Sequence, residues 1–107
     1  DVFDGVTTAH LVEVQRLVGL KSKEDGGVRA DIRANRWIGF LIIDTLGLDR
    51  ADKGHKQRAK KIFATWLASG SFETCDGKDH KGNPREFVTV GRPVNPSEYS
   101  PRASVNG

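Results

Sequence analysis

The sequence predicts a small α+β domain that is mainly α, with three helices followed by a β-hairpin. Its 107 residues are enough for one domain with a modest core. Three stretches before Gly70 repeat apolar residues at the spacing of one helix face, and two short β-forming stretches after it flank a loop rich in turn residues. The single cysteine, Cys75, excludes an internal disulfide and any multi-cysteine zinc site.

Hydrophobicity and cysteine usage also indicate where such a domain works. The longest apolar run, Trp37 to Ile43, is far shorter than the ~20 residues that cross a bilayer, and it is too internal to be a signal peptide. We therefore expect a cytoplasmic domain with no membrane partner. The chain contains no methionine, so we expect it to be part of a longer protein.

The first predicted helix covers Ala9–Val18 and follows a leader at residues 1–6 that shows no periodicity. Thr7 or Thr8 can cap it, because a threonine hydroxyl accepts a hydrogen bond from a free first-turn amide. The apolar stripe of this helix consists of Leu11, Val14, Leu17 and Val18. Residues 19–27 are polar and contain glycines, which predicts a loop.

A brief strand at Val28–Ala30 and a second helix over Ile32–Leu46 are predicted next, with Asp31 as the helix N-cap. Apolar positions of this helix follow one another at alternating steps of three and one, which is typical of a wide buried face. These positions are Ala34, Trp37, Ile38, Leu41, Ile42 and Thr45. Phe40 and Ile43 lie off that face.

The third predicted helix covers Lys53–Gly70 and shows the strongest pattern in the chain. One face carries Ala59, Ile62, Phe63, Trp66 and Leu67, at the spacing of an amphipathic helix. Asp52 or Asp49 can cap it and complement the helix dipole. Gly70 suits a left-handed helix stop. The short connection to the second helix makes the pair a helix-turn-helix pattern.

Ser71–Cys75 and Glu86–Val90 are predicted strands, joined by a loop over residues 76–85. A helix-turn-helix followed by a basic hairpin is the order of a winged helix-turn-helix, so we expect such a domain at residues 7–91. Residues 92–107 combine proline with serine and asparagine, which predicts a flexible tail.

Positive charge is concentrated on the third helix and the hairpin. Residues 1–52 carry 7 Lys/Arg and 9 Asp/Glu, whereas residues 53–92 carry 9 Lys/Arg and only 4 Asp/Glu. The predicted nucleic-acid-binding residues are Lys53, Lys56, Gln57, Lys60 and Lys61 of the helix and Lys78, His80, Lys81 and Arg85 of the hairpin. In a winged arrangement the helix approaches the major groove and the wing touches the backbone or the minor groove.

A run of helical lysines often serves only solubility, and this alternative is weighed against DNA binding. The second cationic element favours DNA binding, with low sequence specificity. Gln57 and Arg58 are the helix side chains best able to contact bases. Trp37 and Trp66 lie on apolar stripes, which favours core packing over stacking on bases.

Neither a metal site nor catalysis is predicted. Asp76, Asp79 and His80 are close in sequence, but the calcium-loop pattern fails at Lys78 and lacks its closing glutamate. Cys75 has no evident histidine partner, which favours a small buried residue. We therefore expect a non-catalytic domain without a cofactor.

Three blocks of sequence carry a resemblance to a known family. They are Thr8–Gln15 with Arg29–Gly39, Leu46–Gly70, and Asp76–Gly91. Together they resemble the C-terminal region of the RecA/RepA-like AAA-family ATPases of phages, plasmids and bacteria. The resemblance implies a DNA-binding accessory domain of an ATPase that acts in replication or repair. Where that family usually has valine, this chain has Thr74 and Cys75.

The same resemblance leaves a second function open. A winged helix can dock other subunits or domains of its parent ATPase, and Phe40 and Ile43 are then the expected contact patch. The nucleotide site itself is not expected here, because the chain has no G-x-x-x-x-G-K-[ST] loop.

Overall fold

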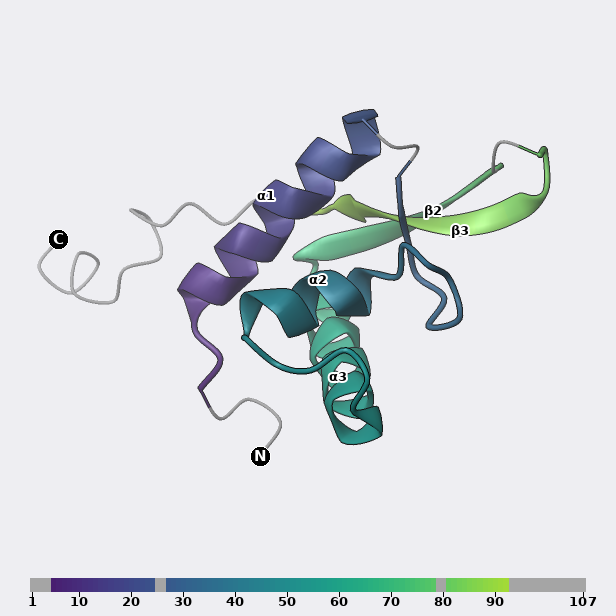
Figure 1. The fold of residues 1–107 in the computed structure, drawn as a ribbon. Helices are drawn as coiled ribbons and strands as arrows, with labels where there is room; N and C mark the ends of the chain where they lie inside the picture. Colours follow the sequence, from purple (N-terminus) through teal and green to yellow (C-terminus); the bar gives the residue numbers. More distant parts are fainter. Residues whose placement is uncertain (1–4, 25–26, 79–80, 93–107) are drawn as a thin grey trace, which may run out of the picture.

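Three helices and a three-stranded antiparallel sheet make up the fold (Figure 1). The structure, a computed structural model, describes residues 5–24, 27–78 and 81–92. The elements follow one another as α1 (Thr8–Glu24), β1 (Val28–Arg29), α2 (Ile38–Thr45), α3 (Lys53–Ala68), β2 (Phe72–Lys78) and β3 (Pro84–Val90). The strand order is β1-β3-β2. The predicted α+β class, mainly α, is confirmed.

The core lies where the three helices meet the base of the sheet. Its fully buried side chains include Val14 and Val18 of α1, Ile38, Ile42 and Ile43 of α2, Ala59 and Ile62 of α3, and Phe72 and Val88 of the sheet. The Phe72 ring lies 6.0 Å from that of Trp66 and 6.2 Å from that of Phe63. Trp37 and Trp66 are 2% and 7% exposed, so the core positions predicted for both are confirmed.

Helix α1 is longer than predicted. It begins as expected, with the Thr7 hydroxyl accepting from the His10 amide at 3.4 Å, but it continues past Val18 to Glu24. The prediction of a loop from residue 19 is therefore wrong. A single glycine in a helix costs only about 1 kcal/mol, and leucine and lysine, both good helix formers, follow it. Gly27, at φ 105°, lies at the turn between α1 and β1.

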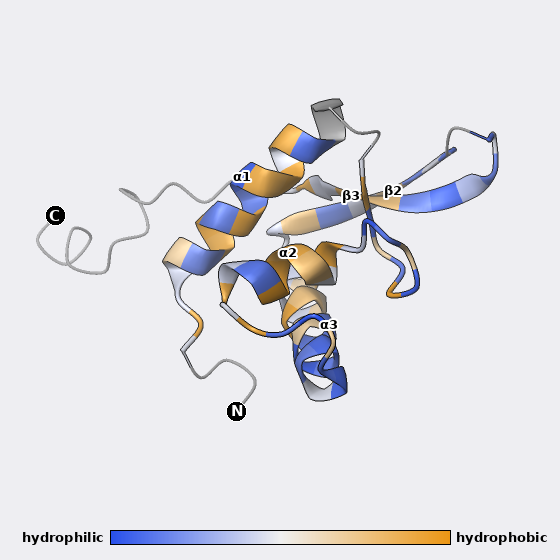
Figure 2. Cartoon of the chain, viewed as in Figure 1, coloured by the Kyte–Doolittle hydropathy of each residue, from blue (hydrophilic) through white to orange (hydrophobic). Residues whose placement is uncertain are grey.

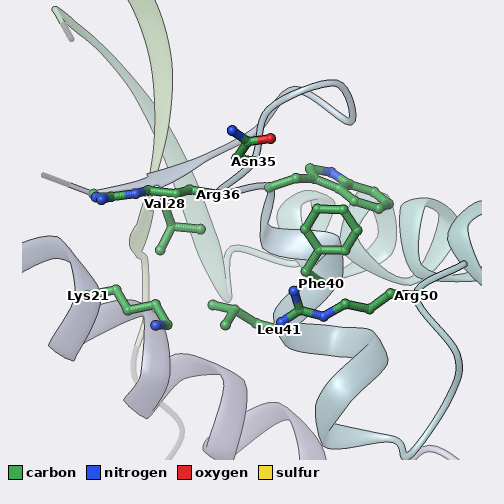
Figure 3. A pocket seen from close by; sticks show the side chains of 9 residues that line it. Lys21, Val28, Asn35, Arg36, Phe40, Leu41 and Arg50 are labelled. Atoms are coloured by element: carbon green, nitrogen blue, oxygen red, sulfur yellow. The ribbon is translucent and has the colours of Figure 1, made fainter. Parts of the chain in front are cut away.

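Helix α2 is shorter than predicted, because residues 31–37 form a turn rather than its first two turns. The Asp31 carboxylate accepts from the Arg33 amide at 2.9 Å, a local bond that competes with helix formation. The Arg36 carbonyl accepts from the Arg29 amide at 2.8 Å, which holds the end of this loop beside β1. The helix consequently begins at Ile38, with Trp37 as its N-cap. Figure 3 shows Asn35 and Arg36 at the end of this loop, with the Arg36 side chain extending alongside Val28 and away from Phe40.

The hairpin is longer than predicted and gains a third strand. Asp76, Gly77 and Lys78 pair with Glu86, Arg85 and Pro84. Residues 76–78, 84 and 85 are therefore strand, although they were predicted as loop. The short strand β1, predicted at residues 28–30, pairs with β3 through Val28 and Val88. Cys75 is exposed, because it alternates with the inward-facing residues of β2; the prediction that it is buried is wrong.

A buried glutamine ties α1 to the sheet. Gln15 is 6% exposed, and its side-chain amide donates to the carbonyls of Ser71 at 2.9 Å and Arg92 at 3.1 Å. The Arg92 amide in turn donates to the Gly70 carbonyl at 2.8 Å. Arg92 is therefore held by the domain, although the predicted tail begins with it. The remainder of that tail and residues 1–4 of the leader lie outside the described residues.

Candidate nucleic-acid interface

The N-terminal half of α3 projects from the body of the domain, and it is hydrophilic (Figure 2). The turn before it is held by side chains. Asp52 caps the helix by accepting from the His55 amide at 3.0 Å, and the Asp49 amide donates to the His55 ring nitrogen Nδ1 at 3.0 Å. Asp52 is thus the N-cap, one of the two predicted candidates. At the other end, Gly70 has the left-handed φ of 85° expected of a helix stop.

The Asp52 cap makes stability depend on pH. Hydrogen bonding from the His55 amide lowers the pKa of Asp52 below its usual value, so the carboxylate favours the folded state. Because the folded pKa is the lower one, this stabilisation is present above about pH 4 and is lost as pH falls through the folded pKa. We expect Asp52→Ala to have a lower melting temperature than the parent protein at pH 7. The difference between the two melting temperatures should be smaller at pH 3.

Asp52→Asn is the matched control for this prediction, because asparagine caps a helix about as well as aspartate but does not titrate. It should keep most of the melting temperature at pH 7. Thermal unfolding followed by circular dichroism between pH 2.5 and 7 measures all three proteins. An alanine variant as stable as the parent at neutral pH would show that the cap contributes nothing.

All five residues predicted on the third helix lie at the surface of α3. Lys53, Gln57, Lys60 and Lys61 are exposed, and Lys56 is half-buried. The helix contains no aspartate or glutamate. In the described part of the chain, its four lysines form no ion pair with a carboxylate. Three arginines outside α3 do form such pairs: Arg16, Arg33 and Arg50. In the described fold these four lysines therefore carry their charge without an ion-pair partner.

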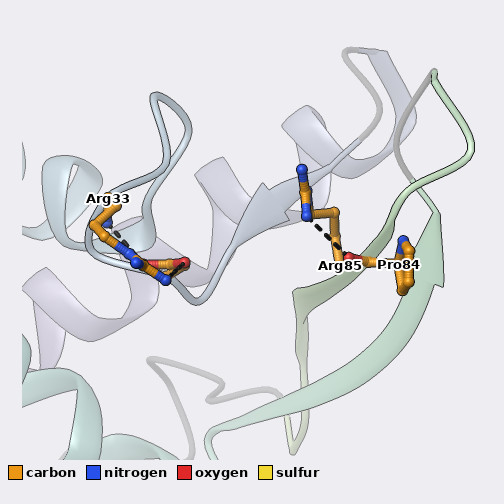
Figure 4. A network of polar contacts seen from close by, with 4 residues as sticks. Arg33, Pro84 and Arg85 are labelled. Atoms are coloured by element: carbon orange, nitrogen blue, oxygen red, sulfur yellow. Dashed lines mark hydrogen bonds and ion pairs between the residues drawn. The ribbon is translucent and has the colours of Figure 1, made fainter.

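The structure divides the predicted hairpin residues between two faces of the sheet. Side chains alternate along a strand, so Lys78 shares the face of Thr74, while Arg85 shares the opposite face with Phe87. The Arg85 guanidinium donates to the Pro84 carbonyl at 3.2 Å (Figure 4). Lys81 is exposed near the tip. His80, also predicted, lies outside the described residues.

A groove of about 410 Å³ separates α3 from the hairpin. Its lining is mainly apolar, with Ile32, Trp37, Phe63, Ala64 and Leu67, together with Ala30 and Thr74. Lys60 lines the groove on the helix, and Asp31 and Glu86 line it from the loop and β3. Asp76 pairs directly opposite Glu86. An acidic stretch therefore lies between the lysines of α3 and the end of the hairpin.

The winged arrangement was expected to place the cations of the hairpin next to those of the third helix, on one exposed side, and this expectation is wrong: the two cationic elements do not form one continuous patch. In Figure 1 the N-terminal end of α3 and the tip of the hairpin point away from each other. From the sequence alone, Glu73, Asp76 and Glu86 were candidates to meet across the hairpin as solvent-facing carboxylates, and the structure pairs Asp76 with Glu86, both exposed. Extending the two strands by period-two alternation is the one signal that would have placed them opposite each other.

Comparisons with protein-family models, with curated proteins and with solved structures found no match to this chain. In the part of the chain that the structure describes, no three His, Cys, Asp or Glu side chains are grouped so that they could hold a metal ion. No helix in those ranges combines the length and the apolar character needed to cross a membrane.

Proposed function

We propose that this chain is a winged helix-turn-helix domain that binds DNA through α3 with little sequence preference. The observation that carries the proposal is the exposed lysine surface of α3, which has no acidic residue of its own and no carboxylate partner among the described residues. The order of the elements supports the winged form, since a third helix in a helix-turn-helix is followed by a β-hairpin.

The lysines of α3 would act on phosphates rather than on bases. Lys53, Lys56 and Lys60 follow one another at i, i+3 and i+7, so they can contact successive phosphates along one groove edge. Lys61 adds a fourth charge. If each of the four lysines neutralises one phosphate, the logarithm of the association constant falls with the logarithm of the salt concentration, with a slope of about −3.6. Gln57, exposed between them, is the side chain placed to reach a base edge.

The hairpin supplies a second and separate contact in this proposal. Lys78 and Lys81 near its tip would meet the DNA backbone at a distance from α3. The carboxylates of Asp76 and Glu86 repel phosphates, so the DNA touches the hairpin only beyond them. Arg85, on the opposite face, takes no part.

Titrating the domain with duplex and single-stranded DNA at several salt concentrations tests the proposal. We expect duplexes of unrelated sequence to bind with similar affinities. The affinity for each of them should fall steeply as the salt concentration rises. Binding that ignores salt, or no binding at low ionic strength, would contradict it.

The wider assignment follows from the sequence resemblance and is part of the same proposal. The domain would serve as the DNA-binding accessory of a RecA-like ATPase that acts in replication or repair. The alternative of a docking module loses its predicted patch, because Ile43 is fully buried and Phe40 is partly buried beside Trp37, with the two ring centroids 5.4 Å apart.

A further inference from the structure

A second cationic site lies on the other side of the loop at residues 30–37. A pocket of about 200 Å³ opens there between the C-terminal half of α1 and helix α2 (Figure 3). Val28, Phe40 and Leu41 form its apolar wall. Lys21 reaches toward Leu41 from α1, and Arg50 reaches toward it from the turn after α2. Arg36 runs beside Val28, so cations from three separate segments line one small pocket.

Among the described residues, three cations and no carboxylate line this pocket. One of the three, Arg50, is bound to the carboxylate of Asp44, to which its Nε donates at 2.9 Å and its Nη2 donates a second bond. Arg50 also lies over the Phe40 ring, 4.9 Å from the centroid. These bonds hold the pKa of Asp44 below its usual value, so Asp44 stays ionised and engaged. In the described part of the chain, neither Lys21 nor Arg36 forms an ion pair with a carboxylate, although the charge of Lys21 also helps to lower the pKa of Asp44.

We propose that this pocket binds a phosphoryl group. The guanidinium of Arg36 presents paired donors that fit the oxygens of a phosphate, and Lys21 adds a point charge. Asn35 also lines the pocket, and its side-chain amide is a hydrogen-bond donor. An apolar wall strengthens such contacts because it lowers the local dielectric. The volume lies below the range of about 300–1,000 Å³ that drug-sized ligands need, so it suits a phosphate with a small group attached.

The phosphoryl group could belong to a free metabolite or to the 5′ end of a DNA strand, since the chemistry of recognition is the same. Its residues are distinct from the α3 lysines, so this inference does not rest on the proposed function. Titrations of the full chain, labelled with ¹⁵N, would use inorganic phosphate, adenosine monophosphate, and a short oligonucleotide with and without a 5′ phosphate. The Val28 backbone amide and the Arg36 side-chain signal report occupancy, because both residues line this pocket and neither lines the groove beside α3.

We expect saturable shifts of both signals with at least one phosphate-bearing probe. Lys21→Gln combined with Arg36→Gln should weaken that binding at least about tenfold. Arg33→Gln is the matched control, because Arg33 lies in the same loop, is exposed and pairs with Asp31 outside the pocket. It should bind like the parent. Arg36→Gln alone, at an exposed position, provides a second variant if the double variant unfolds.

The arms of the experiment separate the two sources. Binding of the phosphorylated oligonucleotide but not of the unphosphorylated one identifies a strand end, and binding of the monophosphate or of inorganic phosphate identifies a free ligand. Equal binding by the double variant and the parent, shifts confined to α3, or no saturation with any probe would overturn the proposal. Replacing α3 lysines leaves this pocket intact, so failure of DNA binding and failure of this site are distinguishable.

Discussion

Replacing Lys53, Lys56 and Lys60 together by glutamine should weaken binding to duplex DNA about 100-fold. All three side chains lie on the outer surface of α3 and have no carboxylate partner in the described residues. A lysine near an anionic surface contributes about 1 kcal/mol, and about 1.4 kcal/mol corresponds to a factor of ten in affinity. The salt slope should fall by about three, because one phosphate contact is lost with each lysine. Fluorescence anisotropy with a labelled duplex measures both quantities.

Two variants that each lose one positive charge control for net charge in this experiment. Lys60→Gln should weaken binding about fivefold, whereas Arg16→Gln removes one exposed cation from α1 and should leave affinity unchanged. The melting temperatures of all variants should stay close to that of the parent, since the three lysines have no ion-pair partner and the exposed pair of Arg16 with Glu13 contributes at most about 1 kcal/mol. Equal losses for the two single variants would mean that total charge, and not the surface of α3, governs binding.

The second large effect is on stability, and it concerns Gly39 in α2. A Cβ at this position would lie 2.2–2.4 Å from three ring carbons of Trp37. That ring is only 2% exposed and is packed in the core, so it cannot move aside without disrupting its neighbours. Gly39→Ala should therefore destabilise the domain by about 3 kcal/mol, the upper part of the usual range for overpacking.

The sign of this effect is diagnostic, because alanine normally stabilises a helix relative to glycine by about 1 kcal/mol. Gly19→Ala in α1 is the control, since a Cβ there would meet no heavy atom within 4 Å. It should stabilise the domain by about 0.5–1 kcal/mol. Urea unfolding of the two variants and the parent gives both differences. A stabilising Gly39→Ala would contradict the packing of Trp37 against α2.

Local sequence signals predicted α3 best, because its N-cap residue, its apolar face and the glycine after its last turn all indicate the same helix. Asp52, the apolar face and Gly70 all lie where they were expected. The ends of α1 and α2 were predicted wrongly for opposite reasons. In α1 a lone glycine did not stop the helix. In α2 the apolar period was real, but the Asp31 turn and the bond from Arg29 to Arg36 held residues 31–37 outside the helix.

Features of the site that depend on contacts between distant segments could not be predicted from the sequence. Exposure of the α3 lysines followed from the helical period, which is local. The division of Lys78 and Arg85 between two faces depends on the strand register, and so does the choice of Asp76 as the partner of Glu86. The pocket of Lys21, Arg36 and Arg50 joins three segments, and no sequence spacing indicates that they meet. The same holds for Gln15 and its bonds to Ser71 and Arg92.

Mapping backbone amide shifts while duplex DNA is added tests the central claim most directly. The account predicts that the largest shifts fall on residues 53–61, with weaker ones at Lys78 and Lys81, and that raising the salt to about 0.5 M removes them. Shifts that are strongest outside α3 and the hairpin end, or that persist at high salt, would contradict it.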